Sequence, residues 1–193
     1  MNPTSKLEAV NTMLSAIGEA PVNSLSSGLV DAELAESILD ATSRTVQSMG
    51  WHWNTEYNYK LSPLLDGTVL LPKNALRCDQ SPNFGVGDID LVMRGSKIYD
   101  RKNHTFTIGK TVEVDLVLAL DFEEMPEAAR QYITIRGARV FQDRTVGSGE
   151  LHGFQEKDEA RALIDLKDAE ADLADFTIFD SYSVSRVLDR KGN

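Results

Sequence analysis

Apolar residues recur at helical spacing near both ends of the chain and alternate with polar residues over short runs in the middle. The first helical stripe has apolar side chains three or four positions apart: Leu7, Val10, Leu14 and Ile17. Ser5 and Glu8 fit a capping box, in which a hydroxyl and a carboxylate accept hydrogen bonds from otherwise unpaired backbone N–H groups. The sequence therefore predicts a first helix that starts after Ser5 and ends at Gly18.

A second helix is predicted over 31–49, with Asp31 at its N-cap and Gly50 as the left-handed residue that ends it. Its buried face is expected to carry five residues: Leu34, Ile38, Ala41, Thr45 and Met49. Trp51 and Trp53 follow, and in an extended segment both indoles would point to one side. We expect them to form either a core anchor, where the helices meet the middle of the chain, or part of a subunit interface.

Short apolar runs separated by turn residues fill the region from 57 to 120. Residues 112–116 alternate between aliphatic and acidic side chains, which predicts a strand with one buried face. The continuation to Leu120 is apolar on both faces, so that end should be covered. Segments 89–93 and 97–100 flank a turn centred on Gly95 and predict a hairpin.

Helical spacing returns after Pro126 and predicts a helix to about Arg144, because proline is favoured at the first helical position. Gly147 and Gly149 predict a loop. The last helix is expected over 155–176, and its narrow apolar stripe is typical of a helix-packing seam: Ala162, Leu166, Ala169, Leu173 and Phe176. Residues from 177 onward predict a tail.

Together these elements predict an α+β fold. Helices from both ends must pack on each other to bury their stripes, which gives a helical bundle over 1–53 and 122–193 with a C-terminal tail. Residues 54–121 are expected to form an inserted, mainly antiparallel β domain.

Composition narrows the range of functions. The chain has 193 residues and a net charge of −10, which argues against a protein that grips nucleic acid through a basic surface. Cys78 is the only cysteine and the three histidines lie far apart, so neither a disulfide nor a zinc site is expected. We expect no cofactor, no leader peptide and no insertion into a membrane, since the longest apolar runs are too short to span one.

Candidate catalytic groups are few. Asp88, Asp90, Glu123 and Glu124 are close enough in pairs to act as a glycosidase acid and base if they faced each other across a cleft. The alternative is a solvated strand end and an acidic cluster at the start of a helix, where the helix dipole favours negative charge. We expect no enzyme, and keep a tail-associated hydrolase of host surface polysaccharide or cell wall as the alternative function.

An acidic face marks the last predicted helix: Asp165, Asp168, Asp172 and Asp175. Such a face is commonly solvated surface, but it would also suit a channel whose wall must not adhere to passing DNA. Four arginines on the preceding helix offer possible ion-pair partners within or between subunits: Arg130, Arg136, Arg139 and Arg144.

Several segments together resemble the tail tubular protein A family of T7-like short-tailed phages. They occur in the family's order and span most of the chain: 14–22, 46–54, 99–101, 121–127 and 158–161. The β region and the tail match less clearly.

The resemblance implies a structural protein of the virion tail, assembled in the host cytoplasm. It implies a dodecameric adaptor ring between the portal protein and the nozzle protein (tail tubular protein B), with tail fibre proteins attached around the junction. DNA would pass through this ring without specific binding. The aromatic tail, with Phe176, Phe179 and Tyr182, is then a candidate for contacting a neighbouring subunit or the portal, as are Trp51 and Trp53.

Overall fold

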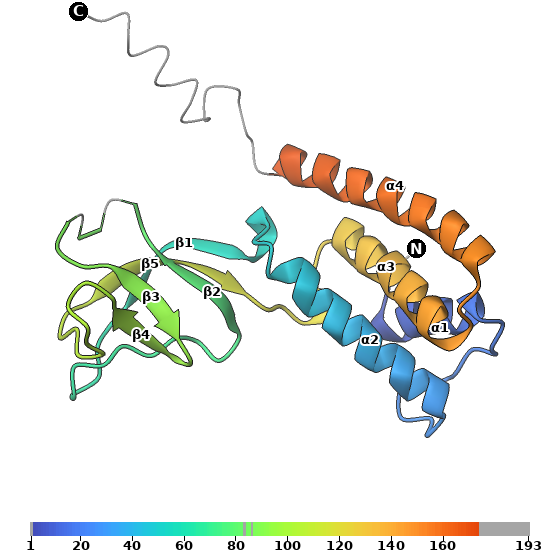
Figure 1. The fold of residues 1–193 in the computed structure, drawn as a ribbon, viewed down its shortest axis with the longest axis horizontal. Coiled ribbons are helices and arrows are strands. Elements are labelled where there is room, and N and C mark those ends of the chain that lie inside the picture. Colours follow the sequence, from blue (N-terminus) through green and yellow to red (C-terminus); the bar gives the residue numbers. More distant parts are fainter. Residues whose placement is uncertain (1, 83, 86, 174–193) are drawn as a thin grey trace, which may run out of the picture.

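The computed structural model describes residues 2–82, 84–85 and 87–173. Within them, helices from both ends of the chain pack together beside a five-stranded antiparallel sheet built from the middle of the chain (Figure 1). The predicted α+β fold is confirmed. Buried apolar side chains form two clusters, one inside the helices and one on the sheet.

Helix α1 spans Lys6–Ala16 and has the predicted capping box. The Ser5 hydroxyl accepts a hydrogen bond from the backbone N–H of Glu8, and the Glu8 carboxylate accepts one from the backbone N–H of Ser5 at 2.8 Å. Gly18 has a φ of +82°, the left-handed conformation expected at this helix end. The start and the end of the helix were therefore correctly predicted from local signals.

Helix α2 spans Val30–Gln47, but two predictions about it were wrong. Asp31 lies in the first turn and the N-cap is Leu29, which has no capping side chain. Of the expected buried face only Ile38 is buried, because the helix turns a different face inward. That face consists largely of small or polar side chains: Ala32, Ala35, Leu39, Thr42, Ser43, Val46 and Gln47.

Helices α3 (Glu127–Thr145) and α4 (Gly149–Leu173) complete the bundle. α3 packs against α1, α2 and α4, and a Cβ atom on Gly137 would lie 3.3 Å from the sulfur of Met13, so the glycine permits close approach to α1. Pro126 is the N-cap of α3 and not its first helical residue. α4 starts at Gly149, six residues before the predicted start. The predicted loop is therefore shorter than expected and consists of residues 146–148.

The strands are β1 (Thr55–Leu61), β2 (Ala75–Gln80), β3 (Leu91–Arg94), β4 (Lys97–Asp100) and β5 (Val112–Leu118). Their order is β1-β5-β2-β3-β4, with every neighbouring pair antiparallel. Val112, Val114 and Leu116 of β5 are fully buried, as the alternation predicted, and Val117 on the opposite face is also covered. The hairpin of β3 and β4 turns at Gly95, whose φ is +61°.

Candidate functional site

The two tryptophans lie at the junction between the helices and the sheet. Residues His52–Asn54 form a short 3-10 turn, so the predicted extended segment is wrong. Trp51 is 9% exposed, and its indole N–H donates to the carbonyl of Val46 at 2.8 Å. Trp53 is half-buried, and its indole N–H has no hydrogen-bond partner within the described residues. Trp51 thus has the contacts of a core anchor.

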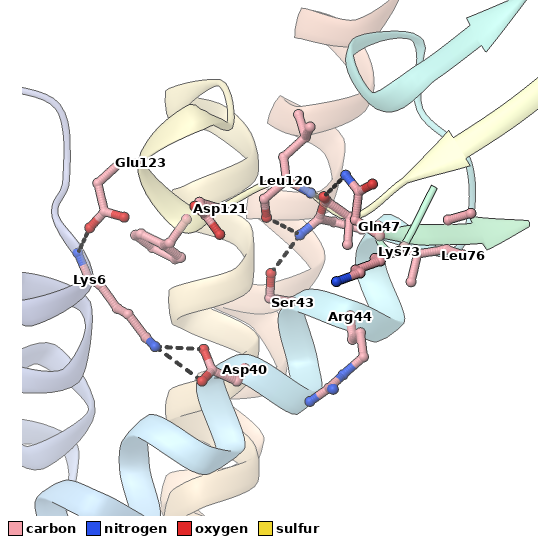
Figure 2. A pocket seen from close by; sticks show the side chains of 14 residues that line it. Lys6, Asp40, Ser43, Arg44, Gln47, Lys73, Leu76, Leu120, Asp121 and Glu123 are labelled. Carbon is pink, nitrogen blue, oxygen red and sulfur yellow. Dashed lines mark hydrogen bonds and ion pairs between the residues drawn. The ribbon is translucent and has the colours of Figure 1, made fainter. Parts of the chain in front are cut away.

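Two buried amides hold the junction together. The Gln47 amide donates to the Leu120 carbonyl at 3.1 Å and accepts from the Leu120 N–H at 2.7 Å, and it also donates to the Ser43 hydroxyl (Figure 2). The Asn54 amide donates to the carbonyls of Gln47 and Leu118, each at 2.9 Å. The end of α2 is therefore fixed to the chain that leaves β5.

A cavity of about 560 Å³ opens beside this junction, between α1, α2 and the segments that flank β2 and β5 (Figure 2). The Lys6 ammonium lies 2.8 Å from Glu36 and 2.9 Å from Asp40. Burial acts to lower the pKa of Lys6, but hydrogen bonds to these two carboxylates raise it above its ordinary value. With Arg44 and Lys73 also in the wall, the cavity has mixed charge, and its Lys6 ammonium is already paired within the protein.

The acidic face lies on the exposed surface of α4. Asp165, Asp168 and Asp172 are exposed, whereas Asp175 lies outside the described residues, as do Phe176, Phe179 and Tyr182. The proposed arginine partners take other roles, and among the described residues none forms a salt bridge with these aspartates. Arg136 and Arg139 pair with Glu159, while Arg130 donates to the carbonyls of Met125 and Thr4. Glu159 is the partner of these two arginines because it lies on the side of α4 that faces α3, where the arginines are half-buried.

The four candidate catalytic carboxylates do not converge. Asp90 pairs with Arg101 at 2.7 Å beside β3, and Asp88 lies in the same loop region. Glu123 and Glu124 lie at the other end of β5, in the turn Phe122–Glu124, where each accepts a backbone N–H hydrogen bond, from Lys6 and Asp121 respectively. Across the described residues, no group of three or more His, Cys, Asp or Glu side chains is arranged to hold a metal ion.

A second concave surface, which we call the α1–α4 groove, runs between α1 and α4 over α3 and has a volume of about 370 Å³. Its floor is formed mostly by small apolar side chains: Ala16, Ile135, Ala138 and Ala162. Asp158, Arg161 and Asp165 of α4 line its margin. Sequence reasoning missed this groove, although the alanines of α4 indicated a surface open to close packing.

Large apolar side chains are exposed on both the helices and the β region. On the helices they include Val30 and Phe154, and in the β region Tyr57 of β1 and Leu64 and Leu65 of the loop that follows β1. Exposed apolar groups that lie together commonly mark surfaces that a partner covers. A membrane span is not among the candidates, since none of the described helices has both the length and the apolar character to cross one.

Comparison with known proteins gives one consistent result. A family model described as "Tube: Tail tubular protein" matches residues 7–176, a range that runs from the second residue of α1 through the whole sheet and all of α4 as described. The chain is also similar to tail tubular protein A of Klebsiella phage KP34, with 29% identity over 161 residues. The aligned part covers 82% of this chain and 84% of the relative.

Proposed function

This chain belongs to the tail tubular protein family, and from that premise we propose that it is a subunit of the adaptor ring that joins the portal to the tail nozzle. Members of this family are structural components of the phage tail and are not known as enzymes. The chain is therefore a protein of the virion tail that assembles with other tail proteins.

The observation that carries the proposal is the extent of the family match, which covers both the helices and the sheet. The exposed apolar surfaces support it, because a ring subunit must present different patches to different neighbours. In this proposal the bundle, with residues 1–53 and 122–193, and the β domain, with residues 54–121, are separate units. The two separate apolar clusters support that division.

We further propose that Asp165, Asp168, Asp172 and Asp175 line the channel of the ring. The exposure of the first three supports this role, since like charge repels DNA phosphates within a Debye length of about 8 Å at physiological salt. DNA then passes without specific binding.

The partners in this proposal are other copies of the chain in a dodecameric ring, the portal protein, the nozzle protein (tail tubular protein B) and the tail fibre protein. Phe176, Phe179 and Tyr182 are proposed to contact a neighbouring subunit or the portal. Trp53 is proposed to contribute the exposed part of its half-buried indole to an interface, and Trp51 to support it from the core.

The test is to add the purified protein to purified portal rings and then to add nozzle protein, with the products imaged by electron microscopy. We expect a second ring stacked on the portal, and nozzle protein only on portals that carry it. Bare portal rings at saturating protein concentration would contradict the proposal.

A further inference from the structure

The loop between β1 and β2 carries a turn with an unusual composition, which we call the leucine turn (residues 64–67). Leu65 at its tip is fully exposed and Leu64 is half-exposed. A single exposed leucine is ordinary, but two adjacent ones at the tip of a projecting turn form a contiguous apolar patch, and such patches mark surfaces for contact.

The leucine turn is held in place by several hydrogen bonds. The N–H of Gly67 donates to the carbonyl of Leu64 at 2.9 Å, and the N–H of Leu64 donates to the carbonyl of Thr68 at 2.7 Å. The Asp66 carboxylate accepts from both the N–H and the hydroxyl of Thr68. Gly67 has a φ of +80°, which completes a short loop with a left-handed glycine. The leucines are thus presented on a fixed turn.

The turn is also anchored to the rest of the sheet. The carbonyl of Gly67 accepts from the N–H groups of Ile108 and Gly109 at 2.8 and 3.0 Å. This places the turn near the end of the sheet where β1 stops and β5 begins, since Leu61 pairs with Val112. In Figure 1 the loop between β1 and β2 reaches the end of the sheet that is remote from the bundle.

The α1–α4 groove is lined by residues of α1, α3 and α4. These helices lie at the other end of the molecule from the loop between β1 and β2 (Figure 1). The alanine floor of the groove leaves space for branched apolar side chains. Because hydrogen bonds hold the turn to the far end of the sheet while the groove is on the bundle, a subunit in this conformation cannot fill its own groove. A fixed apolar projection and an apolar groove on different faces of the same chain produce a head-to-tail contact between copies.

The charges around the two surfaces are complementary. Lys97 forms a β-bridge with Leu70 beside the turn, and Lys110 follows Gly109, which is bonded to the turn. The groove margin carries Asp158 and Asp165, with Arg161 between them. Asp66 keeps its negative charge, because the hydrogen bonds from the Thr68 N–H and hydroxyl lower the pKa of its carboxyl. The region of the turn therefore carries two lysines and one carboxylate, against two carboxylates and one arginine at the groove margin.

We propose that the leucine turn of one copy inserts into the α1–α4 groove of the next copy, with Leu65 against the alanine floor. This inference rests on the proposed ring and names the two surfaces that meet in it. Asp158 and Asp165 then flank the contact, while Asp168 and Asp172 lie further along α4.

The test uses the double variant Leu65→Cys/Ser15→Cys, since Ser15 is exposed and lines the groove. Cys78 does not interfere, because it is buried and burial raises the pKa of its thiol to about 12. Rings are assembled on portal, checked by electron microscopy and oxidised. Denaturing gels without reductant should then show a ladder of linked subunits. The matched control Tyr57→Cys/Ser15→Cys, with an exposed cysteine elsewhere on the sheet, should show none.

The outcomes distinguish a failure of the leucine-turn contact from a failure of the proposed adaptor ring. Intact rings that give no ladder overturn the leucine-turn contact and leave the ring standing, whereas the absence of rings for the wild-type chain overturns the proposed function. A second experiment uses Leu65→Ser and Ser15→Trp, each expected to weaken ring assembly roughly tenfold or more per contact. Their equimolar mixture should give one-to-one dimers, because each such pair retains one intact turn and one intact groove. A mixture that stays monomeric contradicts the inference.

Discussion

Replacing Gln47 by leucine should separate the end of α2 from the chain that leaves β5. The Gln47 side chain is 2% exposed and bonds both the N–H and the carbonyl of Leu120. Leucine has a similar volume but no polar atom, so the variant leaves both backbone groups of Leu120 without their partner in a part-buried position. The Ser43 hydroxyl also loses the amide that donates to it at 2.9 Å.

The magnitude follows from the two orphaned backbone groups. Each buried donor or acceptor without a partner costs about 1–3 kcal/mol, and the added apolar burial offsets about 1 kcal/mol. The free energy of unfolding should therefore fall by about 1–5 kcal/mol. This is a large share of the stability of a typical domain, which is roughly 5–15 kcal/mol.

Urea unfolding followed by tryptophan fluorescence measures this change, because Trp51 and Trp53 lie at the same junction. Hydrogen exchange of the Leu120 amide should accelerate in parallel. Thr45→Ala is the matched control, since Thr45 is exposed on the same helix and its hydroxyl bonds only to the carbonyl of Ala41 among the described residues. The control should stay within about 0.5 kcal/mol of wild type. A Gln47→Leu variant equally close to wild type would refute the reasoning.

Three further predictions concern the sheet and the loop between β1 and β2. Gly67→Ala should lower the free energy of unfolding by about 1–2 kcal/mol because the φ is +80° and the new Cβ would lie 2.7 Å from the Thr107 methyl group; urea unfolding measures it, and an unchanged midpoint contradicts it. Burial acts to raise the pKa of Asp100, but hydrogen bonds from the Asn103 side chain and three backbone N–H groups lower it below the ordinary 3.8. Its stabilisation is therefore complete above about pH 4 and is lost as pH falls through the folded pKa, so thermal unfolding between pH 7 and pH 3 should show a smaller decline in Asp100→Asn than in wild type. Cys78 should react with a thiol reagent only in urea, because it is buried and its pKa is raised to about 12; rapid labelling of the folded chain would show that the sheet opens.

Much of the fold could be predicted because the signals that specify it are local. The capping box of Ser5 and Glu8, the turn at Gly95 and the alternation over 112–116 each depend on neighbours in the sequence, and each was correct. The buried face of α2 was wrong for the opposite reason. Gln47 is buried because Leu120, about seventy residues away, completes its hydrogen bonds, and Ser43 is buried beside it as an acceptor of the same amide. Hydrophobic spacing carries no sign of that distant partner.

The candidate surfaces also divide into those that local sequence predicts and those that depend on distant residues. The exposed aspartates of α4 follow from helical spacing alone, and Asp165, Asp168 and Asp172 are indeed exposed. The α1–α4 groove was not predictable, because its floor combines residues from three helices that meet only in the folded chain. For the leucine turn the sequence held a signal, since Leu64 and Leu65 stand directly before the turn residues Asp66 and Gly67. Periodicity alone does not distinguish such a pair from buried side chains.

The amide junction at Gln47 and Asn54 has a consequence for the geometry of any closed assembly. If one neighbour contacts the helices and the other contacts the sheet, the angle between helices and sheet within each copy sets the rotation from one copy to the next. An error in that angle is then repeated once per subunit around the circle. Copies that differ from the closing rotation form an open spiral instead of a ring. Gln47 and Asn54 supply four of the hydrogen bonds that fix this angle, to Leu120, Leu118 and the last turn of α2. Stiffness at this point, more than affinity at any one contact, then decides whether the last subunit meets the first.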